Sequence, residues 1–424
     1  SLLGAPLFPG SVLDNAWSIR CEELSRAVDR LEAVGSQDAL ILLRASFSAP
    51  RVQHLLRCSP SVDNPGLEKF DSLLRLAVGR ITNSDLSDIQ WLQASLPIKQ
   101  GGLGVRRVSS LALPAFLASA ASTLSLQEQI TASFPCPSDT YFCTYLSTWS
   151  TLFGVPQLSD PLPTKQSFYD RPGILSDRSR IEAALVEPSQ QARFMAAAAP
   201  HSGDWLLALP ISRCGLRLED EAVRIAVGMR LGLDLCVPHQ CRCGAMVDAQ
   251  GIHATVCKKA PGRTVRHHVL NDIVWRALTS AGIPATKEPS GLTRRDGKRP
   301  DGLTLIPWQG GKPLTWDVTV ISTLAESYVR TAVRGGGSVA ELAAARKLDK
   351  YSDLSANYIF QPIAVENLGP LNSSALEFLS ELGHKLAIHS GDERELLFLM
   401  QRISVTIQRF NSVLLHDTFL NDDD

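Results

Sequence analysis

Apolar residues recur at helical spacing through most of the first 235 positions. The stretches CEELSRAVDRLEAV and GLEKFDSLLRLAVGRI carry charges on the opposite face, so each predicts an amphipathic helix. DEAVRIAVGMRLGL predicts another helix within 178–235. The paired glycines of LPIKQGGLGVRR interrupt the pattern as a loop would. The stretch 131–175 is rich in Pro, Ser and Thr with interleaved aromatic residues, and it predicts a partly ordered connection.

The pattern changes beyond a cysteine-rich stretch near position 240. TVRHHVLNDIVWRALTSAG predicts a helix that ends before Gly282 and Pro284. The triplet QGG is typical of a hairpin turn between two strands. Three short β-like runs are predicted near 284–288, 301–307 and 314–321.

Three glycines separate these runs from the next helix. Gly335 to Gly337 predict a hinge, and Ser338 with Glu341 form a capping-box pattern that would start the helix. NYIFQPIAVE alternates as a strand does, and helical segments around 372–389 and 393–414 follow. The order helix, three strands, helix, strand predicts a small α/β domain with a mixed sheet.

The expected fold class is therefore multidomain, mostly α in the first half and α/β in the last part. The predicted domains are a helical domain at 1–130, a partly helical connecting region at 131–235, a cysteine-rich module at 236–262 and an α/β domain at 263–424.

Charge is distributed unevenly along the 424 residues. The whole chain has a net charge of −1, but 241–350 holds 17 Lys and Arg against 9 Asp and Glu, which leaves +8 there and −9 elsewhere. A basic segment in an otherwise acidic chain is typical of a site for a polyanion, with a solvated basic face as the alternative. The longest uncharged run, VSSLALPAFLASAASTLSLQ, predicts a buried helix rather than a membrane span.

Clustered cysteines predict a metal site. No charged segment followed by an apolar run indicates a secretory leader, so we expect a reducing compartment and metal rather than disulfides. Three thiolates and one imidazole would form a closed tetrahedral zinc set, and nearby glycines would let the backbone wrap around it. Buried free cysteines beside an exposed histidine are the alternative. The predicted ligands are Cys241, Cys243, His253 and Cys257, with Cys236, His239, His267 and His268 as substitutes.

Asp301 and Asp317 are single carboxylates in runs otherwise typical of a core. A charge in a half-buried strand is costly unless it is paired or binds a metal. With Glu288 at the end of a third strand, they could converge on Mg²⁺, which prefers carboxylates, waters and phosphates. Lys347 and Lys350 share a face of the following helix and could act on a phosphodiester. Solvent-exposed turn or edge acids are the alternative.

These motifs, in this order, resemble a known family. CRCG…GIH…C, RHHVLND, RPD, WDVTV and RKLDKY together resemble the restriction-like endonuclease domain that one class of non-LTR retrotransposons carries behind a Cys/His zinc knuckle. Those domains belong to the PD-(D/E)xK nuclease superfamily, and the resemblance covers about 236–410. LLRASFSAPRVQHLLRCSP, WLQASLPIKQGGLGVR and LALPAFLAS resemble the thumb and its extension in the reverse transcriptases of such elements. The Asp-Asp box of a polymerase does not occur before the terminal DDD, so no polymerase activity is expected.

The resemblance implies a Mg²⁺-dependent DNA endonuclease with a structural zinc ion. Asp301 matches the acid of the PD element and Asp317 the acid of the (D/E)xK element, while Glu288 matches an acid that some members supply from the preceding strand. It also implies a nuclear protein that nicks DNA at an insertion target to expose a 3′ hydroxyl. Element RNA is a further implied partner, and neither a membrane nor a small-molecule cofactor is expected.

The sequence departs from the superfamily at Thr319, which stands where the motif has its lysine. The retrotransposon enzymes take that lysine from the following helix, which points to Lys347, with Lys350 as the alternative. The residues expected to hold the nucleic-acid backbone are Arg263, Arg266, Arg294, Arg295, Lys298 and Arg299.

Three functional hypotheses follow. The first is the endonuclease; the second is a catalytically inactive retroelement remnant that binds nucleic acid through the zinc knuckle and the basic surface. The third is a helical interaction protein whose carboxylates are incidental. The first two differ in Mg²⁺-dependent nicking, and the third binds neither DNA nor zinc.

Overall fold

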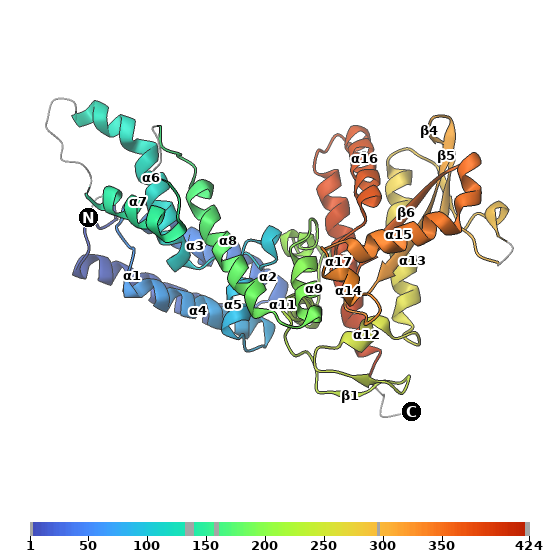
Figure 1. Ribbon diagram of the computed structural model, residues 1–424, viewed down its shortest axis with the longest axis horizontal. Coiled ribbons are helices and arrows are strands. Elements are labelled where there is room, and N and C mark those ends of the chain that lie inside the picture. The colour runs from blue at the N-terminus through green and yellow to red at the C-terminus, as the bar shows by residue number, and fades with distance from the viewer. Residues whose placement is uncertain (1–2, 132–139, 157–160, 295–296, 420–424) are drawn as a thin grey trace. The chain divides into compact units, whose positions relative to one another are not determined.

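The computed structural model describes residues 3–131, 140–156, 161–294 and 297–419. The chain is mostly helical and divides into two compact units. Unit 1 comprises Ser1–Pro97 and Leu103–Ala184, and unit 2 comprises Ile98–Gly102 and Leu185–Asp424. Figure 1 labels most elements of both units.

In the described residues of unit 1, the regular elements are helices. Its elements are α1 (Ser11–Leu31), α2 (Ser36–Leu42), a π-helical turn (Leu43–Phe47), α3 (Ala49–Cys58), α4 (Pro65–Thr82), α5 (Asp88–Ala94), α6 (Val108–Thr131), α7 (Thr140–Phe153) and α8 (Gln166–Ala184). The first two predicted helices are confirmed as α1 and α4. The side chain of Asn64 accepts a hydrogen bond from the Gly66 N–H, and Pro65 follows it, which is why α4 begins there.

A buried carboxylate fixes the start of α6. Asp71 of α4 accepts the backbone N–H groups of Val108 and Ser109 at 2.6 and 3.2 Å, and the Ser109 hydroxyl at 2.5 Å. These N–H groups have no partner within the helix, so Asp71 satisfies them from a distant element. Burial raises the pKa of Asp71 to about 6, although the three hydrogen bonds oppose that shift.

Helix α6 contains the long uncharged run. By length and composition, its segment Val108–Gln127 is apolar enough to cross a membrane. However, 56% of its most apolar stretch is buried inside the protein. It packs against α3 and α8, as a core helix does. That burial is in line with the predicted buried helix.

In the described part of the region 131–175, the chain is largely helical and its aromatic residues form a core. α7 and α8 occupy much of it, whereas 132–139 and 157–160 lie outside the described residues. Trp149 and Tyr169 are fully buried, and the Trp149 indole donates to the Tyr169 carbonyl at 2.9 Å. The interleaved aromatic residues seen in the sequence are the ones that form this cluster.

Unit 2 contains both sites predicted from the sequence. Its helices are α9 (Pro188–Ala197), α10 (Asp204–Leu207), α11 (Asp220–Leu231), α12 (Ile252–Val256), α13 (Gly262–Ser280), α14 (Val329–Ala332), α15 (Ser338–Lys350), α16 (Ser373–Ser390) and α17 (Glu395–His416). Its strands are β1 (His239–Gln240), β2 (Met246–Val247), β3 (Ala285–Lys287), β4 (Gly302–Gln309), β5 (Lys312–Ile321) and β6 (Ile359–Glu366). Short 3₁₀ turns lie at Ile98–Gln100, Ser212–Cys214, Ser290–Leu292 and Ser352–Ala356.

The predicted mixed sheet is confirmed. Its strand order is β3-β4-β5-β6, with the first two pairings antiparallel and the β5–β6 pairing parallel. The QGG turn is also confirmed, since Gln309 pairs with Lys312 and both intervening glycines have positive φ. The order α13, β3, β4, β5, α15, β6 matches the predicted order, with the short α14 inserted before α15.

Helices cover both faces of this sheet (Figure 1). α13 and α16 pack on one face, with α17 against both of them, and α15 packs on the other. Side chains alternate along a strand. Leu314, Trp316 and Val318 therefore enter the core between the sheet and α13 and α16, while Asp317 points to the opposite face, toward α15. The pleat of β5 therefore directs this acid toward the helix that carries the predicted lysines.

The predicted capping box at the start of α15 is wrong. Gly337 is the N-cap, and Ser338 makes no capping hydrogen bond. The buried carboxylate of Glu366 instead accepts the N–H groups of Val339 and Ala340 at 3.1 and 3.2 Å. A residue at the end of β6 thus does the capping, which local sequence could not indicate.

The predicted loop at LPIKQGGLGVRR is confirmed, and a buried arginine anchors it. Arg230 of α11 donates to the carbonyls of Ile98 and Gly102 in the loop, and to those of Ala197 and Ser202, at 2.8–3.3 Å. Burial lowers the pKa of Arg230 to about 10. The hydrogen bonds to these four carbonyls compensate for the burial of its guanidinium.

Candidate metal centre and carboxylate site

The cysteine-rich module folds as a hairpin followed by a short helix. Cys241 and Cys243 lie in the turn between β1 and β2, His253 lies on α12, and Cys257 follows that helix. Gly244 and Gly251 have φ values of 93° and 67°, so the backbone turns at both positions as the sequence predicted.

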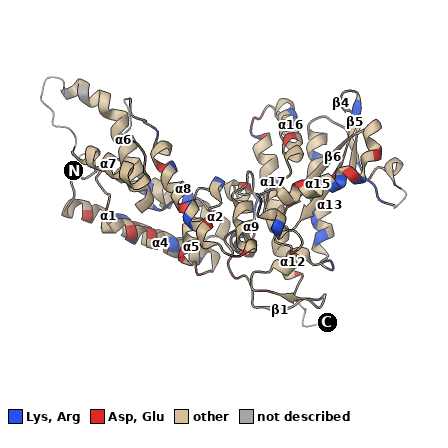
Figure 2. Ribbon diagram, in the orientation of Figure 1, with Lys and Arg blue, Asp and Glu red and all other residues tan. Residues whose placement is uncertain are grey.

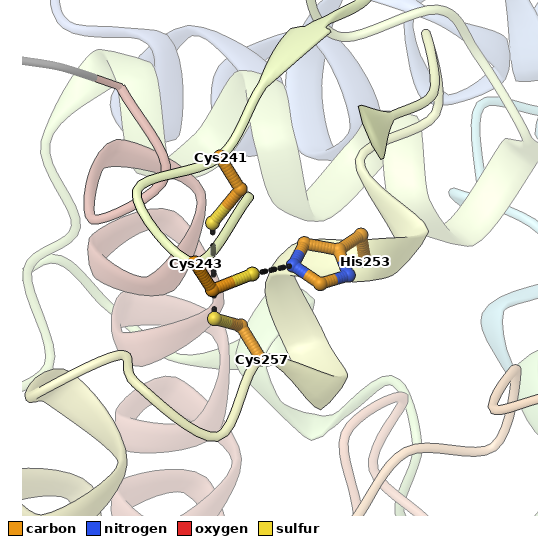
Figure 3. Close-up of side chains that lie close together, drawn as sticks. All are labelled: Cys241, Cys243, His253 and Cys257. Atoms are coloured by element: carbon orange, nitrogen blue, oxygen red, sulfur yellow. Dashed lines mark hydrogen bonds between the residues drawn. The ribbon is translucent and has the colours of Figure 1, made fainter. Parts of the chain in front are cut away.

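All four predicted ligands converge (Figure 3). One ligand atom from each of Cys241, Cys243, His253 and Cys257 lies within 4.8 Å of the others. The Cys241 and Cys257 sulfurs are 3.7 Å apart. Two thiolates on one tetrahedral zinc, with Zn–S near 2.3 Å, are about 3.8 Å apart. The Cys243 sulfur lies 3.1 Å from Nε2 of His253.

The environment of the cluster suits a metal ion. Cys241 and Cys257 are buried, and burial raises the pKa of the Cys241 thiol, so a nearby cation is needed to favour the thiolate form there. The backbone N–H of Ala245 has the opposite effect on Cys243 and lowers its pKa to about 7. This Cys₃His set could therefore hold a metal such as zinc. Four protein ligands leave no position for a reacting water, which favours a structural role.

The substitute ligands named from the sequence lie outside the cluster. The Cys236 thiol contacts the Asp248 carbonyl, and the His239 ring stacks on Phe419. His267 and His268 belong to α13. The cluster itself shares a hydrophobic core with Leu414 and Leu415 of α17, so the metal site is continuous with the interior of unit 2.

Asp301 precedes β4 and is held by several backbone groups. Its N–H donates to the Trp316 carbonyl at 2.9 Å, and its carbonyl accepts the Glu288 N–H at 2.9 Å. Its carboxylate Oδ2 accepts the Val318 N–H at 2.6 Å and Nε2–H of His267 at 3.0 Å. Asp301 is therefore not the solvent-exposed turn acid that the sequence analysis kept as the alternative.

Asp317 lies within β5 and is buried. Its Oδ1 is 2.5 Å from Nζ of Lys347, with 5% of the Asp317 side chain exposed. Burial raises the pKa of Asp317, the neighbouring charge of Asp301 raises it further, and Lys347 opposes both. The structure thus brings the two acids and one lysine together.

The lysine comes from α15. Thr319, at the motif position, is on β5, whereas Lys347 contacts the carboxylate directly. Nζ of Lys350 instead contacts the Tyr351 hydroxyl at 2.9 Å, and that hydroxyl donates to the Arg299 carbonyl at 3.0 Å. Lys347 is therefore paired directly with an acid of the site.

Glu288 is adjacent to Asp301 through its backbone, but its carboxylate pairs with the guanidinium of Arg299. Within the described ranges, the Cys₃His cluster is the one group of three or more His, Cys, Asp or Glu ligands that meets within 4.8 Å. The carboxylate site therefore offers two acids, and a Mg²⁺ ion there remains a prediction.

The predicted nucleic-acid contacts differ in their environments. The Arg294 guanidinium lies over the Tyr351 ring, and the exposed Lys298 carbonyl accepts the Arg294 N–H. Figure 2 shows Lys and Arg along α13 and α15, interspersed with acidic residues on α15. Arg263 donates to the carbonyls at the end of α12. Arg295 lies outside the described residues.

Arg266 is a correction to the predicted interface. Its side chain points into unit 2 with 3% exposure, and burial lowers its pKa to about 10. Because it lies on the buried side of α13, it is not available to a nucleic-acid backbone at the surface. Charge alone did not distinguish this arginine from exposed ones.

Two residues of α13 were missed as members of the carboxylate site. His267 contacts the Asp301 carboxylate, and Nδ2 of Asn271 contacts the Asp301 carbonyl at 3.2 Å. Their spacing of four residues places them on one helical face, which is the signal that the sequence offered.

Comparison with models of known protein families gives no match, and comparison with curated proteins gives none. Function is therefore inferred from the geometry of the two sites.

Proposed function

We propose that the protein is a divalent-cation-dependent DNA endonuclease. One observation carries the proposal: Asp317, buried in β5, is paired with Lys347 and stands next to Asp301, which is anchored at the start of the neighbouring strand. The position of Lys347 on the helix after β5 also supports the proposal, because the resemblance to retrotransposon endonucleases implies a lysine from the following helix.

The residues fit a hard divalent cation. Mg²⁺ is commonly held by one or two carboxylates, with waters and substrate phosphates completing its shell. Asp301 and Asp317 would hold the ion, which when bound supplies a nucleophilic hydroxide and stabilises charge on the phosphodiester. The Cys₃His cluster would hold zinc and support the fold near α13 and α17.

The chain's own groups have distinct roles in this proposal. The Lys347 ammonium acts as a point charge beside Asp317 and stabilises the charge that develops on the scissile phosphate. Water attacks phosphorus, the bond to the 3′ oxygen breaks, and the products are a 3′ hydroxyl and a 5′ phosphate. Arg294, Lys298 and Arg299 contact the phosphate backbone without reading sequence.

Plasmid nicking by zinc-loaded protein in Mg²⁺ or Mn²⁺ tests the proposal. Lys347→Met and Asp317→Asn should abolish nicking, since each removes a charge of the site. Lys350→Met is the matched comparison on the same helix, and it should retain more activity than Lys347→Met, because Lys350 reaches Asp317 through the Tyr351 hydroxyl. Circular dichroism and zinc content would confirm that each variant is folded.

The result that overturns the endonuclease is an intact wild-type protein that binds DNA in a salt-dependent manner yet nicks none. That outcome supports the inactive nucleic-acid-binding remnant. Equal nicking by Lys347→Met and wild type would also contradict the proposed site.

A further inference from the structure

Helix α13 holds the Asp301 segment at two points. His267 Nε2 lies 3.0 Å from Oδ2 of Asp301, and Nδ2 of Asn271, one turn later, lies 3.2 Å from the Asp301 carbonyl oxygen. The Asn271 Oδ1 accepts the indole N–H of Trp316 at 2.8 Å. Because an indole nitrogen can only donate, this contact fixes the orientation of the Asn271 amide.

The hydrogen bonds to Asp301 are unevenly divided between its two oxygens. Oδ2 accepts from both Val318 N–H and His267 Nε2, which uses the two lone pairs of that oxygen. Within the part of the chain that the structure describes, no hydrogen bond to Oδ1 is present. Since a carboxylate only accepts, Nε2 of His267 carries the hydrogen.

The backbone next to Asp301 is also fixed. A Cβ at Gly302 would lie 2.0 Å from a ring carbon of Trp316, so this position requires glycine. Without a side chain at position 302, the Trp316 ring packs directly against the Gly302 backbone, and its N–H donates to Oδ1 of Asn271. Position 301 therefore has its backbone set by Asn271 and Trp316, and its carboxylate plane set by His267 and Val318.

We propose that His267 is a positioning residue that holds Oδ2 of Asp301 and thereby directs Oδ1 to the divalent cation. This inference rests on the proposed nuclease site and adds a residue that the sequence motifs do not contain. Groups that orient a metal-binding side chain typically change metal affinity or activity by about 10–100-fold when they are replaced.

Two substitutions of His267 separate positioning from a general structural role. In Gln the amide nitrogen reaches the place of Nε2, so His267→Gln keeps a donor to Asp301. In Asn the amide nitrogen reaches only the place of Nδ1, so His267→Asn loses that donor at similar polarity. His268→Asn, at an exposed neighbour, is the matched control.

The measurement is Mn²⁺ binding to the zinc-loaded full chain by isothermal titration calorimetry, without DNA. We expect His267→Asn to weaken binding by about 10–100-fold, while His267→Gln and His268→Asn stay close to wild type. The Mg²⁺ concentration for half-maximal nicking should rise for His267→Asn alone. If His267→Asn is poorly folded, His267→Gln still tests the inference, because a folded variant that keeps the donor yet loses Mn²⁺ affinity would contradict the positioning role.

The outcomes distinguish this inference from the nuclease itself. Wild-type binding and nicking together with an unchanged Mn²⁺ affinity in His267→Asn would overturn the positioning role and leave the endonuclease standing. A loss of affinity in His267→Gln equal to that in His267→Asn would also overturn it, because a retained donor should rescue. A wild-type chain that neither binds Mn²⁺ nor nicks DNA overturns the proposed function and this inference with it.

Discussion

Replacing Lys347 with Met should destabilise unit 2 in the absence of divalent cations. Nζ of Lys347 is 2.5 Å from Oδ1 of Asp317, and the side chains are 24% and 5% exposed, respectively. Met preserves the length of the side chain and removes its charge. The substitution therefore leaves a buried carboxylate next to Asp301 with no ammonium beside it.

The magnitude follows from the burial of the pair. Removing one partner of a fully buried ion pair costs about 3–5 kcal/mol. Lys347 keeps some contact with solvent, so screening reduces the expected loss in the free energy of unfolding to about 2–3 kcal/mol. In a unit of this size, about 1 kcal/mol shifts the melting temperature by roughly 2–4 °C. We expect a fall of roughly 5–10 °C in the presence of EDTA.

A double-mutant cycle isolates the interaction from other effects of the substitution. Urea unfolding of wild type, Lys347→Met, Asp317→Asn and the double variant should give a coupling energy of about 2 kcal/mol. Divalent cations should then stabilise Lys347→Met more than wild type, because a bound ion supplies the missing positive charge.

A coupling energy below about 0.5 kcal/mol, the range of solvent-exposed pairs, would refute the reasoning. Lys350→Met provides the comparison on the same helix, since it removes the same charge from a lysine whose Nζ contacts the Tyr351 hydroxyl. A control that loses as much stability as Lys347→Met would show that the effect belongs to the helix rather than to the pair.

Further predictions concern the metal site, one buried acid and one buried arginine. Cys257→Ser should abolish the binding of one zinc per chain, measured by metal analysis of the purified protein, whereas Cys236→Ser should retain it, because Cys236 lies outside the cluster. The folded-state pKa of Asp71 is about 6, above the value of roughly 4 of the unfolded chain. The folded state therefore binds more protons than the unfolded state, so the free energy of unfolding falls as the pH rises. In urea titrations, the free energy of unfolding of wild type should fall by about 2 kcal/mol relative to that of Asp71→Asn as the pH rises from about 4 to 6. A constant difference between the two proteins would contradict this. Arg230→Met should lower the free energy of unfolding by about 3 kcal/mol, since it leaves buried carbonyls without a donor, and Arg230→Lys should restore part of it.

The sequence predicted what depends on local pattern. The mixed sheet, the QGG turn and the four cysteine and histidine ligands all follow from spacing and from turn residues, and the structure contains each of them. For 131–175 the sequence showed interleaved aromatic residues in a partly ordered connection, but it did not show that Trp149 and Tyr169 pack against each other.

What local pattern could not supply are contacts between residues far apart in the chain. The cap of α15 comes from Glu366, and the orientation of Asp301 depends on His267, 34 positions earlier. Arg266 and His267 are adjacent, yet one is buried and the other faces the carboxylates, because helix packing decides which side each occupies. Such contacts exist only once α13 lies on the sheet.

The close approach of Gly302 and Trp316 restricts how this protein can vary over time. No side chain fits at position 302 while an indole occupies 316, so a change at 302 alone would displace the segment next to Asp301. The order of substitutions matters: a smaller residue at 316 must arise first or at the same time. Among descendants of this chain, we expect any non-glycine residue at 302 to coincide with the loss of tryptophan at 316.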